Sequence, residues 1–330
     1  MSDLTNLSYI KNLLSSHDFN FSKGLGQNFL VNPSVCPKIA EYGNAKPGFG
    51  IIEVGTGIGT LTAELAKRAD KVVAVEIDKR LPPILNETLS DFNNVKIIND
   101  DIMNTDIHKL IREEFSGMEV AVCANLPYYI TSPIIMLFLE SGAPVKSLTV
   151  MVQKEAADRL CAQVGTRQVG AITVGVNYYG HAKCLFNVSR GSFIPSPNVD
   201  SAVIRIDISK KYNLSSDEEK FFFSMVKAAF SQRRKTIANS LSSMLGIEKK
   251  IIYTVLSEME LQESMRIEQF DMETLISLSL SLKKIFHNII LFSYNHKLLL
   301  HLMYIQKQFL FHLLSFSYLV QCNCQFRKNH

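Results

Sequence analysis

The stretch 50-GIIEVGTGIGT-60 carries an apolar run directly into a glycine-rich turn, and a helical pattern follows over residues 59–69. Glycines let the chain turn tightly and let a ligand approach the backbone closely. The start of the helix supplies free N–H groups and the positive end of a dipole. The spacing Gly55-x-Gly57-x-Gly59 is one residue shorter than the nicotinamide fingerprint, and glycines alone do not identify a ligand.

Apolar runs alternate with helical patterns on both sides of this turn, from residue 50 to residue 154. The runs that predict strands are 50–54, 71–77, 95–99, 119–124 and 147–153, and the helical patterns are 59–69, 79–92, 106–116 and 131–141. Near-continuous apolar runs are typical of parallel strands that are covered on both faces. The alternation therefore predicts a doubly wound α/β domain. Two further runs, 184–188 and 202–208, predict a hairpin at the sheet edge around 191-GSFIPSPNVDS-201.

The pattern becomes purely helical after residue 208. Amphipathic helices are predicted at 217–230, 233–245, 248–258 and 271–282. We therefore divide the chain into an α/β domain over 1–208, a small all-helical domain over 209–283 and an atypical hydrophobic tail over 284–330. The tail has no Asp or Glu and five of the eight His. We interpret it as a frame-shifted extension rather than a membrane anchor, because its uncharged stretch 308–326 contains His and four Gln/Asn.

Charge is unevenly distributed along the chain. The formal net charge is +4, yet residues 183–250 carry a net +6 and residues 1–182 a net −3. A basic segment after an acidic one fits a polyanionic partner at the junction. The six Cys form no C-x-x-C pair, and the N-terminus shows no signal peptide. Both observations predict a protein of the reducing cytoplasm without stable membrane association.

Acidic residues follow the second and third predicted strands. Glu76 stands twenty-one residues after Gly55, where a carboxylate can take both hydroxyls of a ribose. Asp101 closes the third strand, where a carboxylate can accept from the adenine amine, and Asp100 is an alternative at this position. Together with the glycine turn they describe an adenosine site without a pyrophosphate cradle. S-adenosyl-L-methionine is the cofactor that requires such a site.

The fourth strand ends on 125-NLPYYI-130. The amine on adenine C6 is a poor nucleophile, because its lone pair is delocalised into the ring. The side-chain oxygen of Asn125 and a backbone carbonyl near Pro127 are suitable acceptors for its two protons. The ring of Tyr128 can stack on the base, whereas Tyr129 fits either the core or the site. This arrangement predicts catalysis by positioning and preorganised electrostatics rather than by a general base.

These motifs resemble those of the ribosomal RNA adenine N6,N6-dimethyltransferases. The stretches 23-KGLGQNFLVNP-33, 193-FIPSPNVDSAV-203 and 228-AAFSQRRKTIANSL-241 extend the resemblance over residues 8–283. The resemblance implies a Rossmann-like S-adenosylmethionine-binding sheet and a helical rRNA-binding domain. It also implies that segment 8–40 covers the cofactor. The roles that it implies are cofactor contacts for Asn28, Leu30, Gly55, Gly57, Glu76, Asp101 and Asn125, stacking of Phe193 on a flipped adenine opposite Tyr128, and phosphate contacts for Arg233, Arg234 and Lys235.

The resemblance further implies a substrate. Leu126 and the Gln-Arg-Arg-Lys block indicate the housekeeping branch, which dimethylates two adjacent adenines near the 3′ end of 16S rRNA in a pre-ribosomal particle. A monomer is expected. Two alternatives are a large-subunit rRNA methyltransferase that confers antibiotic resistance and a non-catalytic rRNA-binding assembly factor. A nicotinamide dehydrogenase is disfavoured by the short glycine spacing and by the lack of a catalytic His/Arg set.

Overall fold

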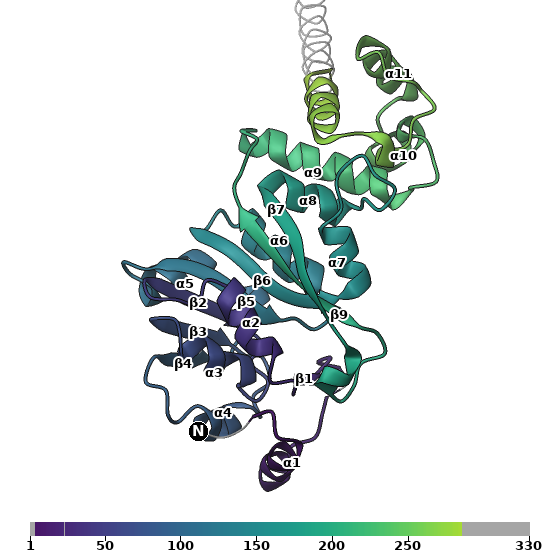
Figure 1. Ribbon diagram of the computed structural model, residues 1–330. Coiled ribbons are helices and arrows are strands. Elements are labelled where there is room, and N and C mark those ends of the chain that lie inside the picture. Colours follow the sequence, from purple (N-terminus) through teal and green to yellow (C-terminus); the bar gives the residue numbers. More distant parts are fainter. Residues whose placement is uncertain (1–3, 23, 286–330) are drawn as a thin grey trace, which may run out of the picture.

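A seven-stranded mixed sheet forms the centre of the protein in a computed structural model that describes residues 4–22 and 24–285 (Figure 1). Its strands lie in the order β4-β3-β2-β5-β6-β9-β7. The first five are parallel, and β9 and β7 add an antiparallel hairpin at the edge, as the sequence predicts. Their bounds are β2 Phe49–Val54, β3 Lys71–Val75, β4 Val95–Ile98, β5 Glu119–Asn125, β6 Val145–Gln153, β7 Gly180–Val188 and β9 Ser201–Ile208.

Helices cover both faces of the sheet because neighbouring strand residues point to opposite sides. Ile52 packs in one core cluster with α5, α6, α7 and α8, whereas Ile51 packs in another with α2 and α3. A third cluster joins α1 to α4. These helices are α1 Leu7–Ser16, α2 Val35–Tyr42, α3 Thr60–Ala66, α4 Pro82–Thr88, α5 Ile107–Glu114, α6 Thr131–Glu140, α7 Lys154–Leu160 and α8 Ala171–Tyr179. The predicted doubly wound α/β domain is confirmed.

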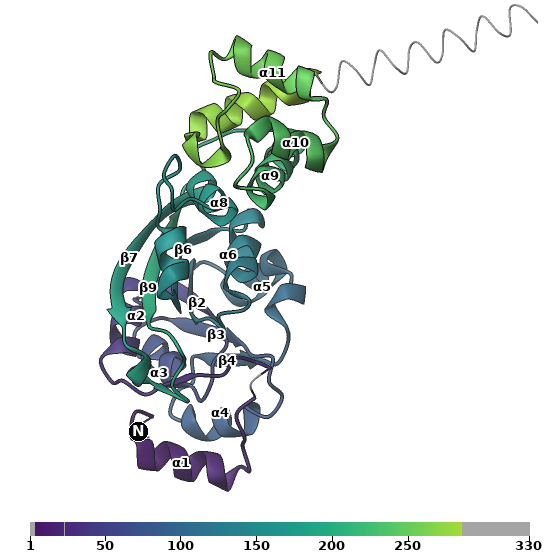
Figure 2. The same cartoon turned by 90° about the vertical axis from the view of Figure 1, so that its right-hand side faces the viewer.

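The C-terminal region is helical and sits at one end of the sheet domain (Figures 1 and 2). It contains α9 Ser216–Ser231, α10 Ile237–Leu245, α11 Lys249–Glu258 and a helical stretch over residues 272–285. The predicted helix at 233–245 starts too early. Thr236 is the N-cap of α10, and its hydroxyl accepts from the backbone N–H of Asn239. Arg233, Arg234 and Lys235 therefore lie in the turn between α9 and α10.

An aromatic cluster joins the helical region to the sheet domain. Tyr178 stacks on Phe222 with ring centroids 5.5 Å apart, and Tyr179 stacks on Phe223 at the same separation. Both phenols donate hydrogen bonds to Glu219 of α9. Burial raises the pKa of a carboxyl, but these bonds and Lys210 bring the pKa of Glu219 below its usual value. One continuous core thus runs from the sheet into the helices, and the domain boundary at 208/209 stays a prediction.

The tail 284–330 falls almost wholly on residues 286–330, outside the described residues. Neither interpretation of the tail is tested. In the part of the chain that the structure describes, no helix has the length and apolar character needed to cross a membrane.

Candidate functional site

A cleft lies at the carboxyl ends of β2, β3, β4 and β5, because residues that follow each of these strands line it. Residues 17–22 and 24–34, between α1 and α2, are called the covering segment here, and Leu25 to Leu30 of this segment line the cleft. Sequence-predicted residues from five separate segments line this cleft: Asn28, Leu30, Gly55, Gly57, Glu76, Asp101, Asn125, Pro127 and Tyr128. Parallel strands bring their carboxyl ends to one edge of the sheet, which is why these distant residues meet.

The glycine turn after β2 is shaped for close approach. Gly55 and Gly57 have φ angles of 75° and 54°, which side chains rarely adopt. A Cβ added at Gly55 would meet nothing within 4 Å, so that it would occupy ligand space beside the cleft wall. A Cβ at Gly57 would lie 3.1 Å from the ring of Phe29, which belongs to the covering segment. The turn is therefore open at Gly55 and lies close to the covering segment at Gly57.

Glu76 holds the glycine turn in place. Its Oε2 accepts from the backbone N–H of Thr56 over 2.8 Å and from the Thr56 hydroxyl over 2.9 Å. Its Oε1 accepts from the backbone N–H of Asp78 over 2.9 Å. A carboxylate offers about four acceptor sites, so these three bonds leave capacity for one ribose hydroxyl. The contribution of Glu76 is thus structural as well as suited to a ligand.

Glu53 is a functional candidate whose role was not predicted from the sequence. It lines the cleft, is fully buried, and neither carboxyl oxygen makes a hydrogen bond of good geometry to the described residues. Burial raises its pKa to about 8, opposed by the nearby Thr62 hydroxyl and reinforced by the charge of Glu76. An unsatisfied buried carboxyl is costly and fits a cationic ligand group. Only its place two residues before Gly55 could have suggested it.

Asp100 and Asp101 both line the cleft, and the choice between them stays open. Asp101 Oδ1 accepts from the backbone N–H of Met103 and caps a short 3-10 helix, Ile102–Asn104. Asp101 Oδ2 makes no hydrogen bond within the described residues, which leaves it available to an adenine amine. Asp100 is exposed, and its Oδ1 accepts from the backbone N–H of Asp101.

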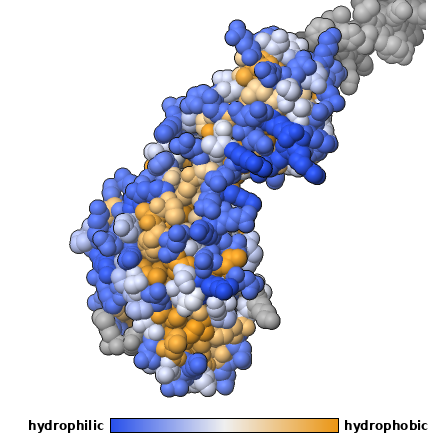
Figure 3. All heavy atoms as spheres, turned by 45° about the vertical axis from the view of Figure 1, so that its right-hand side comes forward, coloured by the Kyte–Doolittle hydropathy of each residue, from blue (hydrophilic) through white to orange (hydrophobic). Residues whose placement is uncertain are grey.

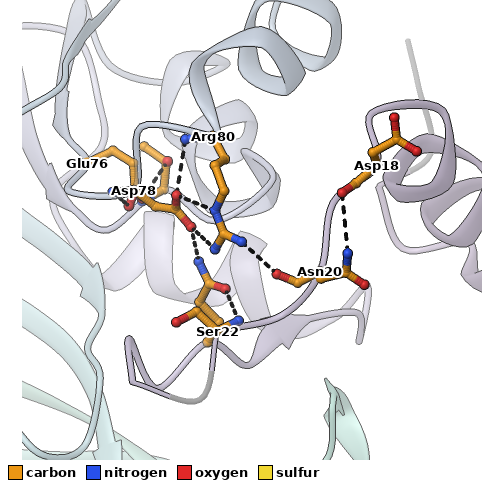
Figure 4. A network of polar contacts seen from close by, with 8 residues as sticks. Asp18, Asn20, Ser22, Glu76, Asp78 and Arg80 are labelled. Carbon is orange, nitrogen blue, oxygen red and sulfur yellow. Dashed lines mark hydrogen bonds and ion pairs between the residues drawn. The ribbon is translucent and has the colours of Figure 1, made fainter.

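The covering segment is tied to the end of β3 by the polar network in Figure 4. Asp78 is 5% exposed and accepts from Arg80 Nε over 2.9 Å, from the Arg80 terminal nitrogen over 2.6 Å, and from Gln27 Nε2 over 2.6 Å. These contacts lower the pKa of Asp78, the side chain of Arg80 most of all. Arg80 also donates to the carbonyl of Asn20 over 3.0 Å and lies over the ring of Phe19. The network fixes the covering segment to the residues that follow β3, next to Glu76.

The motif at the end of β5 presents two acceptor oxygens. Asn125 Nδ2 donates to the carbonyl of Asn28 over 3.2 Å, which leaves Oδ1 free to accept. The carbonyl of Pro127 accepts from the backbone N–H of Ile130 and from the hydroxyl of Thr131. No donor among the described residues reaches the carbonyl of Leu126. The backbone acceptor near Pro127 is therefore that of Leu126, whose direction the following proline ring restricts.

The two tyrosines of the motif lie in different surroundings. Tyr128 is half-buried, and its hydroxyl pairs with that of Ser201 over 2.7 Å. Burial raises the pKa of this phenol. Tyr129 lines the cleft and is 62% exposed, so that it lies outside the core. Ser201 belongs to the 193–203 stretch, and its contact with Tyr128 gives this serine a structural role. It holds the Tyr128 ring in place after β5.

Phe193 does not occupy the exposed position that the expected stacking on a flipped adenine would require. Its side chain is 3% exposed and packs in the core cluster with Leu30, Val35 and Val188, away from the lining of the cleft. The reason is a two-stranded sheet that the sequence did not predict. Strand β1, Phe29–Leu30, pairs with β8, Phe193–Ile194, and sets Leu30 opposite Phe193. The expected exposure of Phe193 is wrong, because the covering segment buries its ring.

The basic residues lie away from the cleft, in the turn between α9 and α10. Arg233, Arg234 and Lys235 are exposed, but Arg233 donates to the carbonyl of Arg167 over 2.9 Å and lies 3.7 Å from Glu268. Arg233 thus links the helical region to the loop between α7 and α8. Figure 3 shows strongly hydrophilic residues gathered where the helical region adjoins the sheet domain.

Comparison with known proteins identifies the family. A profile described as Ribosomal RNA adenine dimethylase matches residues 18–284. The chain belongs to the ribosomal RNA adenine dimethylase family. This dimethylase is 50% identical over 264 residues to a Ribosomal RNA small subunit methyltransferase A of Alkaliphilus oremlandii, covering 80% of this chain and 92% of the relative. It is 44% identical over 279 residues to the protein of that name in Clostridioides difficile, covering 84% and 96%.

Solved structures agree with this assignment. A dimethyladenosine transferase from Plasmodium falciparum superposes with a TM-score of 0.65 at 25% identity, covering 78% of this chain and 98% of the other. The 23S rRNA methyltransferase ErmE superposes with a TM-score of 0.59 at 27% identity, covering 78% and 100%. The dimethylase is therefore an rRNA adenine N6,N6-dimethyltransferase whose methyl donor is S-adenosyl-L-methionine. The open space at Gly55 and the unsatisfied carboxyl of Glu53 fit this donor.

Proposed function

We propose that the dimethylase modifies two adjacent adenines near the 3′ end of 16S rRNA within a pre-ribosomal particle, adding two methyl groups to each N6. The pair of acceptors at Asn125 Oδ1 and the Leu126 carbonyl, beside the cleft that Glu76 and Asp101 line, carries the proposal for the chemistry. The small-subunit choice is supported by relatives of 42–50% identity that bear that name.

The bound cofactor supplies an activated methyl group, and the protein has to present the adenine amine to it. Asn125 Oδ1 and the Leu126 carbonyl would accept hydrogen bonds from the two N–H groups of the amine and draw the nitrogen toward tetrahedral geometry. The lone pair of the nitrogen is then free to receive the methyl group, and the methylated amine loses a proton to water. Donors and acceptors aimed at a developing charge typically change rates by about 10²–10³ each.

Base stacking falls to Tyr128 in this proposal. Its ring is fixed by Ser201 at the hydroxyl and by the strand end at the backbone, so one face can meet the base. The target adenine has to leave its helix or lie in a loop, which costs about a few kcal/mol. Tyr129, exposed at the cleft, can shield the flipped base from water.

On the cofactor side, Glu76 would hold a ribose hydroxyl and Asp101 the adenine amine of the donor. Gly55 would face the methionine portion, and Gly57 would sit beside it under the ring of Phe29. Asn28, Leu30 and Asn125 would close the site. Arg234 and Lys235 would contact rRNA phosphates, which positions the RNA without reading its sequence. We propose a monomer that acts in the cytoplasm, where ribosomes assemble.

Subunit labelling tests this function. Purified dimethylase is incubated with labelled S-adenosyl-L-methionine and undermethylated small or large ribosomal subunits, and the methylated base is then mapped. We expect label in 16S rRNA, on two adjacent adenines near the 3′ end. Label in 23S rRNA alone would instead support the resistance-type enzyme, and RNA binding without label would support the assembly factor.

A further inference from the structure

The covering segment contacts two walls of the cleft through consecutive residues. Gln27 Nε2 donates to Asp78 Oδ2 over 2.6 Å at the end of β3. The carbonyl of Asn28 accepts from Asn125 Nδ2 over 3.2 Å at the end of β5. Gln27 and Asn28 are adjacent in the chain. A displacement of the Gln27 backbone would therefore also displace the carbonyl of Asn28.

The Gln27 end of this connection is fixed on both sides. Gln27 Oε1 accepts from the backbone N–H of Ser22 over 2.9 Å, so its amide group must direct Nε2 toward Asp78. Asp78 is nearly buried and is held by the side chain of Arg80. The backbone N–H of Asp78 in turn donates to Glu76. The contact therefore rests on a rigid strand end rather than on a free surface side chain.

The Asn28 end fixes the orientation of the Asn125 side chain. A backbone carbonyl can only accept, so the atom of Asn125 that faces it is Nδ2 and the opposite atom is Oδ1. The backbone here is itself restrained. Asn28 Nδ2 donates to the carbonyl of Gly26 over 3.0 Å. Gly26 has a φ of 61°, and a Cβ added there would lie 3.3 Å from the ring of Tyr129.

We propose that Gln27 and Asp78 are positioning residues for methyl transfer, which hold the Asn28 carbonyl where it orients the Asn125 amide toward the target amine. The inference rests on the function proposed for Asn125 Oδ1. Misplacement of a reacting group by about 1 Å can cost about 10²-fold in rate. The Gln27–Asp78 contact should therefore affect the turnover number and not only the affinity for the cofactor.

The isosteric variant Gln27→Glu tests the contact. Its carboxylate still accepts from Ser22, but an oxygen replaces the donor that faces Asp78, and two like charges then repel. We expect kcat at saturating S-adenosyl-L-methionine and rRNA to fall about tenfold or more, with the KM for rRNA within twofold. The double variant Gln27→Glu/Asp78→Asn restores a donor and an acceptor. If the effects of Gln27→Glu and Asp78→Asn on kcat were independent, their fold-changes would multiply. The kcat of the double variant should be higher than that product predicts.

Asn20→Ala is the matched control on the same segment, because Arg80 contacts only the backbone carbonyl of Asn20. It should keep kcat within twofold of the unaltered protein. A Gln27→Glu variant that raises only the KM for S-adenosyl-L-methionine, or a double variant without coupling, would overturn the inference. Asn125→Ala distinguishes a failure of the proposed function from a failure of the positioning role alone. If it keeps turnover, the proposed function fails, whereas an inactive Asn125→Ala beside a Gln27→Glu of normal kcat removes only the positioning role.

Discussion

Asn125 Nδ2 donates a hydrogen bond to the backbone carbonyl of Asn28 over 3.2 Å, which joins the motif at the end of β5 to the segment that covers the cleft. The covering segment and the side chain of Asn125 are therefore joined directly by a hydrogen bond. The side-chain oxygen of Asn125 is left to accept a hydrogen bond, in our proposal from the amine of the target adenine.

Glu53→Gln should change the pH dependence of stability. The pKa of Glu53 is about 8 in the folded state and near 4.5 in the unfolded state, so the folded state binds the extra proton between these values. Stability is therefore lost as pH rises through this window. The neutral amide removes that loss. Urea unfolding should give similar stabilities at pH 5, and at pH 8 the variant should be more stable by on the order of a few kcal/mol.

Glu64→Gln is the control for this prediction, since its pKa shift has the opposite sign. Burial would raise the pKa of Glu64, but Lys67 and Arg68 lower it overall. Its charge therefore supports folding above the unfolded pKa, and this variant should gain no stability at pH 8. An unchanged gap between Glu53→Gln and the unaltered protein from pH 5 to pH 8 would contradict the shift at Glu53.

Phe193→Ala should destabilise the fold, because the ring is buried against Leu30 and Val188. Removing a buried phenylalanine ring typically costs about 3–5 kcal/mol. Phe193→Leu keeps most of the apolar volume and should cost less than about 1.5 kcal/mol. Denaturant unfolding of both variants measures the difference. Equal midpoints for Phe193→Ala and the unaltered protein would place the ring outside the core.

Arg233→Lys should weaken rRNA binding about as much as Arg233→Gln, because a lysine cannot reproduce the reach of the guanidinium to Arg167 and Glu268. Arg234→Lys should retain most of the binding, since Arg234 would act on phosphates as a charge. Arg234→Gln should reduce the slope of log affinity against log salt by about 0.7–0.9. Filter binding at several salt concentrations measures these quantities. Normal binding by Arg233→Lys would make Arg233 a simple phosphate contact instead.

Much of this organisation could be predicted from the sequence because local patterns determine it. Apolar runs that alternate with helical patterns predicted the parallel strands. The carboxyl ends of these strands lie at one edge of the sheet and bring Gly55, Glu76 and Asn125 together. Helix α8 could not be predicted. Its residues AITVGVNYY favour strands, and it is helical because it packs on α6, with Gly175 so close to Met136 that a Cβ would lie 2.9 Å from the sulfur.

Contacts between distant segments account for the other differences. A phenylalanine beside two prolines suggests an exposed loop, yet the pairing of β1 with β8 buries Phe193. The buried carboxyl of Glu53 without a hydrogen-bond partner among the described residues, and the Tyr128–Ser201 hydrogen bond, also depend on residues far apart in the chain. Arg233 sits in a basic run, and only the fold shows that it contacts Arg167.

The single-turnover rate of Asn125→Ala tests the central claim most directly. The variant is saturated with S-adenosyl-L-methionine and mixed with undermethylated small subunits, and formation of methylated adenine is followed in time. We expect the rate to fall by about 10²-fold or more, as for the loss of one preorganised polar group, while the midpoint of unfolding stays close to that of the unaltered protein. A folded variant that transfers methyl groups at a near-normal rate would contradict the role of Asn125 in presenting the adenine amine.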